Sequence, residues 1–452
     1  MHVGKIVNRS EAFILFLGDV LVLYFSLWIT LFLRRFEIPD TNALESHFQP
    51  FTILFVLWIL VFFIAGLYDK HTTFLKKRIP SIILNAQVVN IILGIFFFYF
   101  IPYFGITPKT TLFIFLVVSF LCVVTWRRNS LMFFESPERQ AAILIGSGSE
   151  MDELKREVNG NPRYGIFFAS TIDLSDIADL DFQKEVVERV YAEGITTIVI
   201  DTKHENVIQI LPKFYNLMFS GVRFIDMHKV YEDIFDRIPL SLVQHSWFLE
   251  NISATRKFTY EFLKRAMDIV LSIPLLLVSF VLFPFVYLAI RLEDKGPLFI
   301  SQDRVGRNNH VIRIFKVRTM TGSDSGDDVL ASKHEVTKTG AILRKLRIDE
   351  LPQLWNVFRG DLSLIGPRPE FPAMVKHYEH EVPFYNVRHL IKPGLSGWAQ
   401  IYHEHHPHHG TDVGETRVKL SYDLYYIKNR SITLDLKIAL KTVKTILSRA
   451  GI

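Results

Sequence analysis

Two adjacent carboxylates, Asp349 and Glu350, stand in the most basic region of the sequence. Lys and Arg side chains hold phosphate oxygens through charge-assisted hydrogen bonds, and a carboxylate can bind Mg²⁺ or attack phosphorus. An acid pair among cations therefore suits a Mg²⁺-assisted attack on a pyrophosphate, in which one carboxylate attacks and the other moves protons or holds metal. The basic residues of this region are Lys316, Arg318, Arg344, Arg347 and Arg368.

The neighbouring segments predict the elements that position this pair. Residues 302–307 and 315–320 are typical of strands or extended chain, and residues 340–348 of a helix. We expect Asp349 to cap a second short helix that ends at Gly360, with its free N–H groups facing a phosphate. The alternative is purely structural, because most Asp-Glu pairs only cap a helix and pair with an arginine.

Four apolar segments predict four transmembrane helices. Residues 12–33, 51–68, 82–101 and 111–126 are long enough to cross a hydrocarbon layer and are almost free of charge. Asp19 lies inside the first segment. We expect it to be neutral or paired with another helix, because a charge in the membrane needs a partner but needs no cargo.

The loop charges predict the orientation of these helices. Basic residues gather before the first helix, between the second and third, and after the fourth, where Arg127, Arg128 and Arg139 follow. The positive-inside rule then places the N-terminus and everything after residue 127 in the cytoplasm.

A fifth apolar segment, residues 267–290, is interrupted by Pro274 and Pro284. Proline removes a helix hydrogen bond and bends or breaks the helix. We therefore predict a re-entrant hairpin that breaks at Ser272 and Pro274 and returns to the side from which it entered. An ordinary kinked crossing is the alternative, and it would place residues 300–452 on the opposite side.

Between these membrane segments, residues 140–250 alternate between apolar runs and helical periods. Such alternation predicts a parallel, Rossmann-like α/β domain. Its first turn (GSGSEM) has the first two glycines of a dinucleotide fingerprint, Gly146 and Gly148, but Met151 where the third belongs. We therefore favour a structural or regulatory domain over one that binds a nucleotide.

Composition narrows the class of protein. Hydrophobic residues make up 49% of the 452 residues and the mean hydropathy is +0.23, which argues against a disordered or purely soluble chain. The one cysteine, Cys122, excludes a scaffold held by intrachain disulfides. Residues 256–452 hold 29 Lys and Arg against 20 Asp and Glu, which indicates an anionic partner such as a phosphate, a nucleic acid or a lipid headgroup.

Four motifs follow one another in the C-terminal region. They are Lys316-Val317-Arg318-Thr319-Met320, Asp349-Glu350-Leu351-Pro352-Gln353, Gly366-Pro367-Arg368-Pro369 and Pro393-Gly394-Leu395-Ser396-Gly397. Through them, residues 260–450 resemble the bacterial polyprenyl-phosphate hexose-1-phosphate transferases, in which Phe is usual at the place of Val317. The four-helix start and the middle region resemble the long form of that family, which begins O-antigen, capsule and exopolysaccharide units.

The resemblance implies a phosphoglycosyltransferase of the bacterial inner membrane with a two-step reaction. Asp349 would attack the β-phosphorus of a UDP-sugar, UMP would leave, and undecaprenyl phosphate or another polyprenyl phosphate would then attack the phosphosugar on Asp349. It further implies that Glu350 binds metal or transfers protons and that Arg368 holds a phosphate. We expect a Mg²⁺ cofactor at Asp349 and Glu350. The phosphate ligands that we add from charge and position alone are Lys316, Arg318 and Arg347.

Two further segments are charged but carry no motif. Residues 403–409 hold five His and one Glu around Pro407, and we expect a loop rather than a metal site because no ligand pattern continues elsewhere. Residues 422–447 alternate basic and apolar side chains at helical spacing. We expect an amphipathic helix at the membrane or against a second copy of the chain in a homodimer, and no nucleic-acid interface.

The expected architecture has three domains: an α-helical membrane domain (residues 1–135), a Rossmann-like cytoplasmic α/β domain (136–252) and a mixed α/β catalytic domain with the re-entrant helix (253–452). Two rival functions remain open. A glycosyltransferase that moves the sugar alone would release UDP instead of UMP. A membrane scaffold that senses a nucleotide through its middle domain would show no turnover. No motif encodes which hexose is accepted.

Overall fold

The computed structural model describes residues 11–68, 79–101, 109–134, 139–162, 164–174, 183–252, 258–293, 296–321, 335–402 and 412–448. The chain divides into two compact units, one of which contains residues 1–143 and the other residues 198–452, and the segments between are divided among them. The three predicted domains stay a prediction. The histidine-rich residues 403–409 lie outside the described residues.

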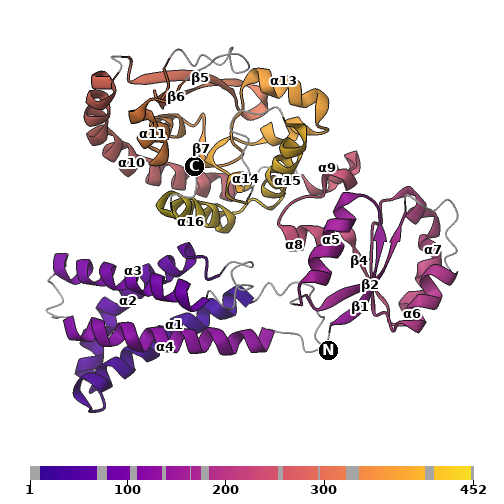
Figure 1. Cartoon of the computed structure of the whole chain (residues 1–452), viewed down its shortest axis with the longest axis horizontal. Coiled ribbons are helices and arrows are strands. Elements are labelled where there is room, and N and C mark those ends of the chain that lie inside the picture. Colours follow the sequence, from indigo (N-terminus) through magenta and orange to yellow (C-terminus); the bar gives the residue numbers. More distant parts are fainter. Residues whose placement is uncertain are drawn as a thin grey trace. The chain divides into compact units, whose positions relative to one another are not determined.

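Long apolar helices form the N-terminal part of the structure, and all of those described there are long and apolar enough to cross a membrane. This confirms the four predicted spans. Helix α2 begins well before residue 51, because Asp40 caps it by accepting a hydrogen bond from the Ala43 N–H at 2.9 Å. The helices are α1 (Glu11–Arg35), α2 (Thr41–Ile64), α3 (Ile79–Phe100) and α4 (Lys109–Phe134), as Figure 1 shows.

Asp19 is fully buried among these helices. Its carboxylate pairs with Arg127 of α4 and accepts a hydrogen bond from the Tyr68 hydroxyl at 2.7 Å, while Arg127 donates to the Leu67 carbonyl at 2.8 Å. The predicted paired contact is therefore confirmed. Arg127 is therefore an ion-pair partner inside the bundle and not a loop charge. Of the three arginines used to predict the orientation, only Arg128 and Arg139 still count as basic residues after the fourth span. The orientation itself stays a prediction.

We expect Asp19→Asn to destabilise the helical bundle by about 3 kcal/mol, because it leaves the Arg127 guanidinium buried without a counter-charge. Thermal unfolding of the detergent-solubilised chain measures this loss. The double variant Asp19→Asn with Arg127→Gln removes both charges and should recover at least half of it. Equal stability of the single and double variants would contradict the pairing.

A four-stranded sheet with strand order β2-β1-β3-β4 follows the helical bundle. Every side chain of β3 is buried, as is usual for a strand covered on both faces. The alternation of strands and helices confirms the sequence pattern, whereas the likeness to a Rossmann fold stays a prediction. The elements, shown in Figure 1, are β1 (Gln140–Gly146), α5 (Ser149–Gly160), β2 (Ile166–Asp173), the π-type helix Gln183–Glu188, α6 (Arg189–Ala192), β3 (Thr197–Ile200), α7 (Glu205–Phe219), β4 (Arg223–Asp226) and α8 (Met227–Phe235).

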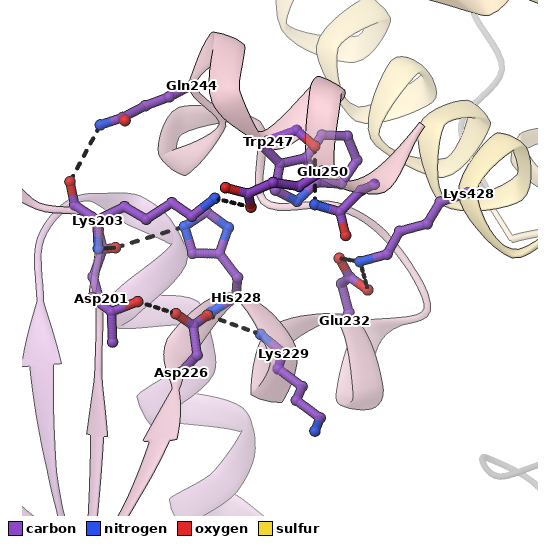
Figure 2. A network of polar contacts seen from close by, with 12 residues as sticks. Asp201, Lys203, Asp226, His228, Lys229, Glu232, Gln244, Trp247, Glu250 and Lys428 are labelled. Carbon is purple, nitrogen blue, oxygen red and sulfur yellow. Dashed lines mark hydrogen bonds and ion pairs between the residues drawn. The ribbon is translucent and has the colours of Figure 1, made fainter. Parts of the chain in front are cut away.

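Residues 236–252 contact the chain just after the C-terminal end of β3. Figure 2 shows Gln244 donating to the Lys203 carbonyl at 3.3 Å and the Lys203 ammonium pairing with Glu250 at 2.8 Å. The segment consists of the 3₁₀ turn Leu240–Leu242 and helix α9 (His245–Asn251). The side chains of Gln244 and Glu250 thus lie at the C-terminal end of β3.

The same segment is also part of the C-terminal core. Trp247 packs in one hydrophobic cluster with Leu420 and Leu424 of α15 (Val413–Asn429), and the Ile238 N–H donates to the Ser421 carbonyl at 3.1 Å. On the same helix, Lys428 forms an ion pair with Glu232 at 2.6 Å (Figure 2). Helix α15 is therefore covered by residues that precede the C-terminal part in the sequence.

The C-terminal part combines short strands with many helices (Figure 1). Strands β5 and β6 pair antiparallel, and β7 and β8 pair parallel. The two predicted extended segments and the helix near residue 340 are confirmed. The elements are α10 (Phe258–Glu293), β5 (Phe299–Val305), the 3₁₀ turn Arg307–Asn309, β6 (Val311–Val317), α11 (Lys338–Lys345), the 3₁₀ turn Ile348–Glu350, α12 (Gln353–Arg359), β7 (Ser363–Ile365), α13 (Pro372–Glu381), the 3₁₀ helix Tyr385–Leu390, β8 (Gly394–Ser396), α14 (Trp398–Tyr402), α15 and α16 (Ile432–Ser448).

Both ends of α10 are fastened to the C-terminal part. Near its start, Asp268 accepts a hydrogen bond from the Leu364 N–H at 2.9 Å, and at its end Glu293 accepts one from the Lys338 N–H at 2.7 Å. Its middle is apolar and exposed. The helix is continuous through Ser272 and Pro274, and Figure 1 shows that it changes direction along its length, so a bend takes the place of the predicted break. The re-entrant path stays a prediction.

Candidate active site

Asp349 and Glu350 lie in a 3₁₀ turn between α11 and α12. Arg347, just before the turn, has left-handed backbone dihedrals (φ 55°), which redirect the chain after α11. The prediction that Asp349 caps α12 is wrong, since Pro352 occupies the position before that helix. The predicted end of α12 is confirmed, because Gly360 follows it at φ 95°.

The Glu350 carboxylate is held by arginines. Arg368 Nη2 donates to Glu350 Oε1 at 2.8 Å, and Arg347 Nη1 lies 3.5 Å from the same oxygen. Although burial opposes it, the positive charges of Arg368, Lys316 and Arg347 hold the pKa of Glu350 down at about 2. Glu350 is therefore ionised at neutral pH and firmly placed.

The Asp349 carboxylate has a different environment. It is half-buried, and its Oδ1 atom is buried with no hydrogen-bond partner in the part of the chain that the structure describes. Burial and the neighbouring Glu350 carboxylate raise the pKa of Asp349 to about 6, against the charges of Lys316, Arg347 and Arg344. The two adjacent carboxylates thus differ in pKa and in contacts, and Asp349 has an oxygen atom left for a ligand.

Lys316 comes to this pair from strand β6. Burial and the charges of Arg368 and Arg304 lower the pKa of the Lys316 ammonium to about 8, against the nearby Glu350 and Asp349 carboxylates. The structure thus brings to the acid pair Lys316 and Arg347, which we assigned from charge and position, and Arg368, which the resemblance implies. Their role as phosphate ligands stays a prediction.

The other two cations of the region are positioned differently. Arg344 Nε donates to the Thr319 hydroxyl at 2.9 Å, and its charge still acts on Asp349. The Arg318 guanidinium lies against Gly296, where a Cβ atom would overlap it. Its predicted role as a phosphate ligand stays a prediction.

The loop that carries Arg368 is built by two of the sequence motifs. The Gly366 N–H donates to the Ser396 carbonyl at 2.8 Å, and the Gly394 N–H donates to the Pro367 carbonyl at 2.9 Å. A Cβ atom on Gly394 would come within 2.1 Å of the Gly366 nitrogen, so the close approach of the two segments requires glycine. The pairing of β7 with β8 therefore fixes the backbone next to Arg368.

Arg388 supports this loop from behind. Its side chain is almost fully buried, donates from Nη2 to the Arg368 carbonyl at 3.0 Å and pairs with Asp423 at 2.8 Å. Arg388 Nη1 also lies 3.7 Å from Glu370, which Lys419 contacts as well. Arg388 could not be predicted from the sequence, because no motif contains it and because Asp423 and Arg368 lie on other elements.

Residues 259–449 match the family model of the bacterial sugar transferases. The UDP-N-acetylgalactosamine-undecaprenyl-phosphate N-acetylgalactosaminephosphotransferase of Aeromonas hydrophila is 43% identical over 202 residues, 42% of this chain and 45% of that one. The UDP-glucose:undecaprenyl-phosphate glucose-1-phosphate transferase of Caulobacter vibrioides is 40% identical over 189 residues, 41% of this chain and 70% of that one. The exopolysaccharide production protein PSS of Rhizobium leguminosarum is 39% identical over 196 residues, 41% of this chain and 96% of that one. The chain belongs to the bacterial sugar transferase family.

Membership confirms the resemblance carried by the four motifs and the prediction of a phosphoglycosyltransferase. The family model covers the part of this sugar transferase that holds the acid pair. The matched segment spans 45% of the length of the Aeromonas relative.

The glycine-rich turn after β1 in this sugar transferase is contacted by a later segment of the same chain. Glu150 Oε1 accepts a hydrogen bond from the Ser241 N–H at 3.2 Å, which puts a carboxylate at the start of α5, where a dinucleotide-binding turn would hold a phosphate. Met151, in place of the third glycine, is buried beside Gly146. These contacts support a structural or regulatory role, which stays a prediction.

Helix α16 turns its basic residues inward. The Lys441 ammonium lies 4.0 Å from the centre of the Tyr402 ring, and that of Lys437 lies 5.0 Å from the Trp398 ring. Leu436, by contrast, is half-exposed. The helix is amphipathic, but in the opposite sense to a basic helix that faces anionic lipid with its lysines, and a homodimer stays a prediction.

Proposed function

We propose that this sugar transferase moves a hexose-1-phosphate from a UDP-sugar to undecaprenyl phosphate, as an early membrane step of exopolysaccharide, capsule or O-antigen synthesis. One observation carries the proposal. Asp349, whose Oδ1 atom has no hydrogen-bond partner in the described structure, lies beside Glu350, which Arg368 holds in place, and both are surrounded by cations. The names of the Aeromonas and Caulobacter relatives support the substrates, and that of the Rhizobium relative supports the polysaccharide.

The reaction proceeds in two displacements at one phosphorus atom. The ionised Asp349 carboxylate attacks the β-phosphorus, the bond to the bridging oxygen breaks, and UMP leaves with the electron pair. An oxygen of polyprenyl phosphate then attacks the same phosphorus. The bond to Asp349 breaks, which restores the carboxylate and gives polyprenyl-diphospho-sugar. Lys316 and Arg368 hold the phosphate oxygens whose charge is redistributed during each displacement.

A Mg²⁺ ion fits the acid pair. In the described residues, no group of three or more His, Cys, Asp and Glu side chains could hold a metal alone. Mg²⁺ bound with substrate phosphates needs only one or two protein carboxylates, and the unpartnered Asp349 Oδ1 is one suitable ligand. Asp349 and Glu350 would hold the ion, which would neutralise charge on the pyrophosphate.

Helix α10 supports a re-entrant arrangement in the membrane. Its ends both contact the C-terminal part, whereas Leu277 and Phe280 in its middle are 66% and 77% exposed. This supports a re-entrant path, because the apolar middle needs lipid while both ends remain on one folded body. Asp349 would then lie at the cytoplasmic face of the inner membrane, where UDP-sugars and the lipid phosphate can meet.

The test is a screen of UDP-sugars with membranes that contain the chain, and the product to be identified is the nucleotide. UMP release that depends on added undecaprenyl phosphate supports the proposal. UDP release would indicate a glycosyltransferase that moves the sugar alone. No release with any UDP-sugar would leave a non-catalytic scaffold as the better account.

We expect kcat/KM to show a bell-shaped pH profile with limbs near pH 6 and pH 8. It falls by about tenfold per pH unit below 6 as Asp349 takes up a proton, and above 8 as Lys316 loses one. Lys316→Arg keeps a charged side chain at all these pH values, so the alkaline limb should disappear while the acid limb stays. An unchanged alkaline limb in this variant would show that another group sets it.

A further inference from the structure

Three cations meet at the C-terminal end of α12, away from the acid pair. Arg265 of α10 donates to the Val357 and Phe358 carbonyls, both at 2.6 Å. A Cβ built on Gly360 would lie 3.4 Å from Lys392 Nζ and 3.6 Å from Arg265 Nη2, so both charges face the bare Gly360 backbone. Arg307 is the third. It begins the 3₁₀ turn whose Asn309 side chain is hydrogen-bonded to His389, three residues before Lys392. Burial and the charges of Arg265 and Arg307 lower the pKa of Lys392, against the charge of Asp268.

These charges lack acidic partners. Within the described ranges, no carboxylate forms an ion pair with Arg265, Arg307 or Lys392, and the Arg307 Nε atom is buried without a hydrogen-bond partner. The two nearby acids are used elsewhere. Asp268 accepts hydrogen bonds from the Ser363 hydroxyl and the Leu364 N–H. Glu261 pairs with Arg430 at 3.2 Å.

Exposed aromatic side chains stand on the two helices, α10 and α12, that meet at these cations. Phe262, one turn before Arg265 on α10, is 64% exposed. Trp355 and Phe358 of α12 stack with ring centres 5.7 Å apart and are both exposed. An anion that binds beside these exposed aromatic side chains is best matched if it carries an apolar chain.

We propose that Arg265, Arg307 and Lys392 form a phosphate-binding site that receives a lipid-borne phosphate. The site rests on the proposed function for its purpose, since it would hold the acceptor lipid before it reaches Asp349. Helix α12 lies between the two places in the sequence, and its 7 residues at a rise of 1.5 Å per residue give it a length of about 10 Å. The phosphate would move along this helix between binding and attack, while its tail stays beside α10.

The first test is protection of Lys392 from acetylation, followed by peptide mass spectrometry. The full chain is placed in phosphatidylcholine nanodiscs, with undecaprenyl phosphate, with phosphatidylglycerol, or with inorganic phosphate in the buffer. Slower acetylation of Lys392 with undecaprenyl phosphate alone supports an acceptor site, and equal slowing with phosphatidylglycerol supports a general lipid-phosphate site. Protection by inorganic phosphate alone, or by none of the three, overturns the lipid assignment.

Matched variants connect this protection to the site. Arg307→Gln breaks no side-chain hydrogen bond or ion pair with a described residue, so the fold should survive, and protection of Lys392 should be lost. Lys376 on the exposed side of α13 is the control lysine, and its acetylation should not respond to lipid. Because labelling needs no turnover, this result is interpretable even if the proposed reaction fails.

A kinetic test then addresses the acceptor role. Arg307→Gln should raise KM for undecaprenyl phosphate about tenfold, the effect of one lost charge-assisted hydrogen bond, and leave KM for the UDP-sugar unchanged. Arg417→Gln removes an exposed arginine of α15 and should change neither. Equal KM values for the lipid in Arg307→Gln and Arg417→Gln would contradict an acceptor site.

Discussion

Asp349→Asn abolishes UMP release, with an expected loss in kcat of about 10⁴-fold or more. Asn has the shape of Asp but no negative charge, so it cannot form the covalent phosphosugar. The substitution removes no hydrogen bond to Asp349 Oδ1 within the described structure, so folding should be retained. Nucleotide release from a UDP-sugar, measured with undecaprenyl phosphate present, gives the rate.

Glu350→Gln is the matched variant, because it removes the adjacent charge but leaves the nucleophile. We expect a smaller loss of about 10²-fold, since the Arg368 guanidinium loses its partner and the phosphate is held less well. Incubation with a sugar-labelled UDP-sugar, without acceptor lipid, separates the two roles. Label should remain on the Glu350→Gln chain and be absent from Asp349→Asn. Label on Asp349→Asn would assign the nucleophile elsewhere.

Arg388→Met should destabilise the C-terminal part by about 3–5 kcal/mol, the second large effect. The substitution leaves Asp423 buried without its ion pair and removes the donor to the Arg368 carbonyl. Thermal unfolding of the solubilised chain measures the loss. Arg417→Met, on the exposed face of the same helix as Asp423, is the matched control and should stay within about 0.5 kcal/mol of the parent chain.

The double variant Arg388→Met with Asp423→Leu distinguishes a lost ion pair from a lost packing contact. Removing both charges should restore part of the stability, because an uncompensated buried carboxylate costs more than an apolar pair. A double variant that is less stable than Arg388→Met would contradict this account. Activity should remain low in both variants, since neither supports the Arg368 loop.

Sequence patterns predicted the elements of this chain better than their long-range contacts. Apolar length identified the spans, and alternation identified the middle strands, because both depend on local burial. The prediction that Asp349 caps α12 was wrong because Arg347 adopts a left-handed conformation, which cannot be predicted from an arginine in the sequence. Arg127 was counted as a loop charge because its partner, Asp19, lies on the first helix.

In the active site, too, local features could be predicted from the sequence and long-range contacts could not. The adjacency of Asp349 and Glu350 is visible in the sequence, but their different pKa values come from contacts with Arg368 and Lys316 on other elements. The convergence of Arg265 with Lys392 likewise requires the folded positions of α10, α12 and the segment before β8. Residue type predicts which chemistry is available, and tertiary contacts decide which residue performs it.

The position of Trp247 has a consequence for any shorter chain that contains α15. With Ile238 and Val243 it fills the cluster formed by Leu420 and Leu424, although all three precede the segment that matches the family model. The Rhizobium relative is matched over 96% of its length by 41% of this chain. A chain that contains α15 but lacks residues 238–247 would expose this apolar surface unless other residues covered it.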